Sequence, residues 1–110
     1  MDLNEFQKKA IETAMYPEKH KIIYPALGLG DESGEVLGKI RKWLREDDGS
    51  GEMTHERKES IKGELGDVMW FVSNLANDLG FALEDVAKFN IEKLQSRKER
   101  GVIKGDGDNR

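Results

Sequence analysis

Two short segments of the 110-residue chain contain carboxylates at the same helical spacing. Residues 30–40 read GDESGEVLGKI and residues 63–72 read GELGDVMWFV, so each contains E-x-x-[E/D] followed by valine. The two pairs are Glu32 with Glu35, and Glu64 with Asp67. Side chains three residues apart lie on one side of a helix, about one turn from each other. Carboxylates placed in this way can bind a hard divalent cation such as Mg²⁺ or Mn²⁺ through oxygen.

Helical geometry gives both pairs the same position relative to the apolar stripe of their segment. At about 100° per residue, the first acid of each pair lies about 70° from the centre of the stripe, and the second lies about 60° further out. If the two helices pack side by side, four acids meet at one edge of the contact, where repulsion and desolvation favour a bound cation. The alternative is a solvated acidic face. A salt bridge to Lys39, four residues on, explains Glu35 but none of the other three acids.

The elements that must position these acids are helices. Apolar spacing predicts four of them, over residues 3–16, 25–46, 54–78 and 83–100. Asp2 and Thr54 are the expected N-caps of the first and third helices, and residues 46–54 are an expected loop. The prediction is an all-α protomer resembling a four-helix bundle, with the long second and third helices antiparallel. It forms one domain over residues 1–100, followed by a glycine-rich tail, 101–110, expected to be extended or mobile.

The third predicted helix is more apolar than one buried face requires. Five consecutive residues, 68–72, are all apolar, so they extend around the helix beyond a single stripe. A second copy of the chain packed against the additional apolar surface is the simplest explanation. We therefore expect a homodimer or homotetramer.

The composition excludes several classes of protein. A formal net charge of −4 argues against broad nucleic-acid binding, which usually requires a basic surface. The chain has no cysteine, so disulfides and thiolate metal sites are excluded. It has no apolar run near the roughly 20 residues that span a bilayer, and its first ten residues lack the apolar centre of a signal peptide. We expect a cytoplasmic protein that does not bind membranes.

The two acidic segments together resemble the MazG group of all-α nucleoside triphosphate pyrophosphohydrolases. The signature of that group is E-x-x-E, a spacer and E-x-x-D, and the spacer here is residues 36–63, or 28 residues. Lys93 and Arg97, one turn apart in NIEKLQSRKERG, match a later basic element, so the resemblance covers roughly residues 24–100. The group usually has a basic residue one turn before the second acidic pair, where this chain has Ser60.

The resemblance implies a Mg²⁺-dependent hydrolase, with Mn²⁺ as a possible substitute. It implies cleavage of an NTP or dNTP to the monophosphate and pyrophosphate, in housecleaning or regulation of the nucleotide pool. The four carboxylates Glu32, Glu35, Glu64 and Asp67 are then the metal ligands, one of which instead orients or deprotonates the attacking water. Asn90, Lys93 and Arg97 are the implied contacts to the sugar and phosphates. Judged without the resemblance, the two basic residues fit a solvated helix C-terminus better than a phosphate contact.

Two other functions are consistent with the same sequence. One is a related pyrophosphohydrolase with a different substrate, such as phosphoribosyl-ATP, dUTP or dCTP. The other is a catalytically silent helical interaction module whose acids serve solubility or partner binding. Because one chain does not identify the groups that would recognise a base, the substrate stays open.

Overall fold

The computed structural model describes residues 1–47 and 51–110 and shows an all-α protein. These residues contain no strand, which confirms the expected fold class. The elements are α1 (Leu3–Glu12), the 3₁₀ helix η1 (Glu18–His20), α2 (Ile23–Asp47), α3 (His55–Asp78) and α4 (Leu83–Glu99). Part of the expected loop at 46–54 lies outside the described residues. Within the described parts of the chain, no helix is both long and apolar enough to span a bilayer.

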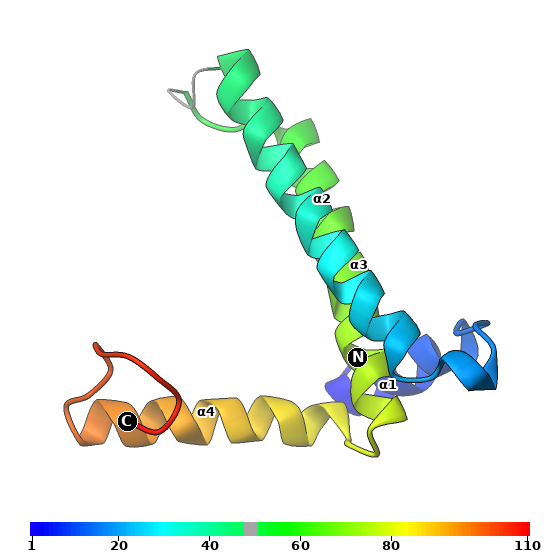
Figure 1. Cartoon of the computed structure of the whole chain (residues 1–110). Coiled ribbons are helices and arrows are strands. Elements are labelled where there is room, and N and C mark those ends of the chain that lie inside the picture. The colour runs from blue at the N-terminus through cyan, green and yellow to red at the C-terminus, as the bar shows by residue number, and fades with distance from the viewer. Residues whose placement is uncertain (48–50) are drawn as a thin grey trace.

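The long helices α2 and α3 form an antiparallel hairpin, as the sequence predicts (Figure 1). Helix α1 packs across the base of this hairpin, mainly against α3. Helix α4 starts at the same base and extends away at a wide angle, so its second half leaves both hairpin helices (Figure 1). Completion of the bundle by a second chain stays a prediction.

Three of the predicted helices begin and end within two residues of the expected positions, and both expected N-caps are present. Asp2 Oδ1 accepts a hydrogen bond from the Glu5 N–H at 2.8 Å, and Thr54 Oγ1 accepts one from the Arg57 N–H at 3.2 Å. Helix α1 is the exception, because it ends at Glu12 instead of near residue 16. Thr13 caps it there and also accepts a hydrogen bond from Trp70 Nε1 at 2.7 Å, a tertiary contact that the sequence does not reveal.

The connection between α1 and α2 is held by one carboxylate at the end of α3. Asp78 Oδ2 accepts hydrogen bonds from the Ile22 N–H and the Tyr16 hydroxyl, both at 2.9 Å. Burial of the hydroxyl and its hydrogen bond to Asp78 raise the pKa of Tyr16. Ile22 has a φ of 70°, which is unfavourable for a β-branched residue. The bond to Asp78 therefore helps to stabilise a strained turn immediately before α2.

A buried glutamine joins α1 to the turn between α3 and α4. Gln7 Nε2 donates a hydrogen bond to the Phe81 carbonyl at 2.9 Å, and Gln7 Oε1 accepts one from the Leu83 N–H at 3.0 Å. The N-cap of α4 is Ala82, whose side chain cannot cap, so Gln7 satisfies a free N–H at the first turn of this helix. This pairing fixes the point from which α4 leaves the hairpin.

Gly28 of α2 lies against Phe71 of α3. A Cβ atom at this position would lie 2.1 Å from Phe71 Cε1, closer than any real side-chain contact. The Phe71 ring cannot move freely, because Tyr24 and Trp70 pack against it with ring centroids 6.1 and 4.8 Å away. Only glycine therefore allows α2 and α3 to pack at this distance.

We predict that Gly28→Ala lowers the free energy of unfolding by about 1–3 kcal/mol, as expected for an overpacked contact. Gly30→Ala is the matched control, since it lies in the same helix and a Cβ there meets nothing within 4 Å. It should instead stabilise the protein by about 0.5–1 kcal/mol, because alanine loses less backbone entropy on folding. Urea denaturation followed by circular dichroism measures both. Equal effects of the two substitutions would contradict the packing argument.

Candidate metal centre

Three of the four predicted acidic residues come together between α2 and α3. Glu32 of α2 and the pair Glu64 and Asp67 of α3 each offer one carboxylate oxygen, and these atoms lie within 4.8 Å of one another. The side chains of Glu32 and Glu64 are half-buried and that of Asp67 is exposed. The group therefore lies at the edge of the helix contact, where ligands can enter from solvent.

The position of this group follows from the packing at Gly28. Glu32 is four residues after Gly28, and Asp67 is four residues before Phe71, so each acid lies about one turn from the contact between Gly28 and Phe71. Because the helices are antiparallel, these two turns lie on the same side of that contact. The glycine that permits close packing thus also brings acids from different helices together.

The electrostatics of the group show uncompensated negative charge. Partial burial raises the pKa of Glu32, and the nearby carboxylates of Asp67, Asp31, Glu64 and Glu35 raise it further. Asp31 adds to this field from the position before the first pair. Such repulsion makes the ionised group costly in the absence of a cation.

One lysine offsets part of this charge. Lys39 Nζ lies 3.8 Å from Glu64 Oε1, and both side chains are largely shielded from solvent. The sequence spacing had suggested Glu35 as the partner of Lys39, but the ion pair is instead made across the hairpin. The interhelical pair leaves Glu35 without the salt bridge that would explain it, and a single lysine does not balance three converging carboxylates.

Glu35 occupies a different position from the other three predicted ligands. It is exposed on α2 and does not belong to the group of three carboxylates, although its charge is near enough to raise the pKa of Glu32. Glu35 would therefore have to move to share one ion with Glu32, Glu64 and Asp67.

The donor atoms suit a hard divalent cation. All three are carboxylate oxygens, the ligands that Mg²⁺ and Mn²⁺ prefer, and the described residues place no histidine among them. The residual negative charge of the group matches a cation of charge +2. Water and a phosphate could supply the remaining ligands, as is usual for Mg²⁺.

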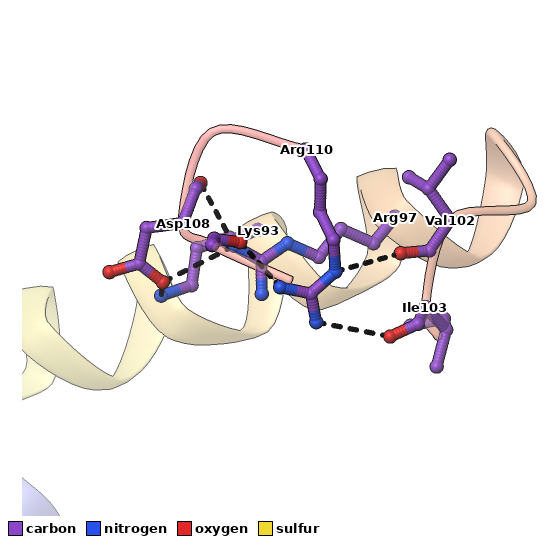
Figure 2. Close-up of polar contacts among 7 residues, drawn as sticks. Lys93, Arg97, Val102, Ile103, Asp108 and Arg110 are labelled. Atoms are coloured by element: carbon purple, nitrogen blue, oxygen red, sulfur yellow. Dashed lines mark hydrogen bonds and ion pairs between the residues drawn. The ribbon is translucent and has the colours of Figure 1, made fainter. Parts of the chain in front are cut away.

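The predicted substrate contacts lie on the part of α4 that extends away from the hairpin (Figure 1). Asn90 is exposed, whereas Lys93 and Arg97 contact the C-terminal segment of the chain (Figure 2). The structure thus brings the two basic residues together, but within one chain it does not bring them to the acids. The sequence reasoning missed two partners, Lys39 for Glu64 and Asp108 for the basic pair. Neither is signalled by local spacing, because both contacts depend on how distant segments pack.

Comparison with known proteins identifies one family. The model of the MazG nucleotide pyrophosphohydrolase domain matches residues 23–102, which include both acidic pairs and the basic residues of α4. The chain is also 44% identical to Gene 37 protein of Mycobacterium phage L5, in an alignment of 116 positions that covers all of both proteins. No solved structure matches the chain.

We predict that Glu32→Gln stabilises the metal-free protein at pH 7. Because the pKa of Glu32 is raised on folding, the folded state binds more protons than the unfolded state, and stability falls as pH rises from the ordinary glutamate pKa through the raised one. The amide of glutamine stays neutral at every pH, so the variant does not undergo this loss of stability. Thermal unfolding in EDTA measures it, and the advantage of the variant should disappear at a pH below the ordinary glutamate pKa. A variant less stable than wild type at pH 7 would contradict the repulsion.

Proposed function

Because the chain belongs to the MazG nucleotide pyrophosphohydrolase family, we propose that it cleaves an NTP or dNTP to the monophosphate and pyrophosphate with Mg²⁺. Members of this family are pyrophosphohydrolases that act on nucleotides and typically depend on a divalent metal. The observation that supports the proposal best is the convergence of Glu32, Glu64 and Asp67 from two helices within 4.8 Å. We further propose that the enzyme acts in the cytoplasm, on the nucleotide pool.

The acidic group fits a triphosphate only through a cation. A triphosphate has close to four negative charges at neutral pH, so carboxylates alone would repel it. Divalent metal bound here would neutralise charge on the phosphates and lower the pKa of an attacking water. In this proposal Glu32, Glu64 and Asp67 hold the metal, and the half-buried positions of Glu32 and Glu64 limit competition from bulk water.

Glu35 then has a separate role. It is exposed, next to the metal-binding group on α2, and it has no ion pair with Lys39 to hold it elsewhere. We propose that Glu35 orients the attacking water and accepts a proton from it. The water oxygen forms a new bond to phosphorus as the bond between the α and β phosphates breaks, and the proton passes to the carboxylate.

We test the reaction by measuring pyrophosphate release from the eight common NTPs and dNTPs, with Mg²⁺, with Mn²⁺ and with EDTA. Release should require the metal, and Asp67→Asn should reduce it more than about 100-fold, since even residues behind metal ligands contribute 10–100-fold. Glu59→Gln is the matched control, because it removes a charge from the same helix at an exposed ion pair with Lys62. Equal loss in both variants, or release in EDTA, would contradict the proposal.

The same substrate panel separates the alternatives. Turnover limited to phosphoribosyl-ATP, dUTP or dCTP would retain the chemistry and change the substrate. No turnover of any of these substrates by folded protein, together with no stabilisation by Mg²⁺, would favour the silent interaction module. The converging acids favour the enzyme, because solubility alone does not require carboxylates to share a half-buried edge.

We also propose that the working protein is a homodimer or homotetramer. An apolar cavity of about 230 Å³ lies where α1, α3 and α4 meet, and its lining includes Val68, Met69 and Val86. Phe89 continues this apolar surface along α4 and is 70% exposed. A second copy would cover it and could bring Asn90 and the basic residues of one chain to the acids of another.

Sedimentation at micromolar concentration should therefore give a mass of two or four 12.5 kDa chains. Phe89→Asp should shift the protein to the monomer, because a charge on a buried contact is costly. Gln95→Glu, which adds the same charge elsewhere on α4, should leave the assembly intact. A wild-type protein that sediments only at 12.5 kDa would contradict the assembly.

A further inference from the structure

The basic pair on α4 already binds an anion, which is the side chain of Asp108. Asp108 Oδ1 lies 3.4 Å from Lys93 Nζ and 3.3 Å from Arg97 Nη2 (Figure 2). The hydrogen bonds from Arg97 and Lys93 hold the pKa of Asp108 below its ordinary value. One carboxylate thus bridges the two cations, although it comes from the tail that the sequence predicted to be extended or mobile.

Arg97 is buried in a way that requires an oxygen ligand. Its side chain is only 6% exposed, and its Nη2 also donates to the Asp108 carbonyl at 2.9 Å and to the Gly107 carbonyl at 3.5 Å. A buried guanidinium that lost all of these partners would be strongly destabilising. The buried guanidinium therefore needs oxygen acceptors, and residues of the tail supply them.

The tail forms a loop that can open without unfolding α4. Gly101 and Gly107 have φ values of 71° and 82°, which permit the reversal of direction after the helix. Arg110 closes the loop by donating to the carbonyls of Val102 and Ile103 (Figure 2). It also donates to the carbonyl of Gly107. The contacts of Arg110 are all within residues 101–110, so releasing them breaks no hydrogen bond within α4.

The side chains of Asp108 and Arg97 differ in their exposure to solvent. The side chain of Asp108 is 84% exposed, whereas that of Arg97 is almost completely buried beneath the loop. The carboxylate thus approaches the basic pair from the solvent side, along the route that an external anion would take. Among the described residues of this loop, Asp106 is a second acid that makes no hydrogen bond or ion pair.

We propose that Lys93 and Arg97 form an oxyanion site that Asp108 occupies in the free protein, so that the loop 101–110 competes with phosphate-bearing ligands. The inference rests on the proposed function in naming a phosphate as the ligand. A phosphate has more charge and more acceptor oxygens than a carboxylate, and it suits the guanidinium fork equally well. The loop keeps the buried arginine satisfied until such a ligand displaces it.

Calorimetric titration with inorganic pyrophosphate in EDTA tests this, because without metal the acidic group does not attract the anion. Asp108→Asn removes the competing charge and should bind pyrophosphate about tenfold more tightly than wild type, as expected if the loop is closed about 90% of the time. Arg110→Ala should act in the same direction by opening the loop, without changing the basic pair. Circular dichroism establishes that both variants are folded.

Asp106→Asn is the matched control, since it removes the same charge from the same loop without touching the basic pair. Its affinity should stay within about twofold of wild type. Tighter binding in the two loop-opening variants alone would support the inference. Equal affinity of wild type and Asp108→Asn, equal gains in Asp106→Asn, or no pyrophosphate binding by any variant would each overturn it.

The hydrolase assay makes the two proposals separable. If Asp108→Asn binds pyrophosphate more tightly but wild type cleaves no nucleotide, the anion site is supported and the proposed reaction fails. If wild type cleaves nucleotides but Asp108 has no effect on pyrophosphate affinity, the reaction stands and the competing loop is overturned.

Discussion

The close contact of α2 and α3 at Gly28 is the constraint on which the rest of the structure depends. No other residue fits against the Phe71 ring, which packs against Tyr24 and Trp70. One turn away, the same spacing between the helix axes places Glu32 beside the acids of α3. Widening the contact would relieve the repulsion between the carboxylates, so the apolar packing keeps together charges that would otherwise separate. This is a common arrangement at ligand sites, where local strain is offset by packing elsewhere.

The negative charge of the three converging carboxylates is only partly balanced by a lysine. Lys39 compensates Glu64, but partial burial and the nearby carboxylates still raise the pKa of Glu32. A fully compensated group would be more stable and would have little affinity for a cation. A group without any lysine would oppose the packing of the two helices more strongly. The observed arrangement lies between these extremes and favours binding of a cation at the edge of the hairpin.

The second half of α4 presents the opposite charge in a different part of the molecule. Gln7 fixes the start of this helix at the base of the hairpin, and the helix then extends away from the acids (Figure 1). Its basic residues Lys93 and Arg97 form ion pairs with Asp108 instead. The acidic group and the basic pair thus lie on separate arms of one chain. An assembly that brings the two arms together would combine a metal-bound triphosphate with cations for its phosphates.

The sequence by itself determined the helices, their caps, the antiparallel hairpin and the family, because helical periodicity and capping are local properties. It also identified the acids, since both pairs repeat at one angle to their apolar stripes. Only the tertiary structure decided that Lys39 pairs with Glu64, that Glu35 lies outside the three-carboxylate group, and that the tail folds back onto Arg97. These outcomes depend on contacts between segments distant in the chain. Their partners are chosen by the distance between packed elements, which no local spacing specifies.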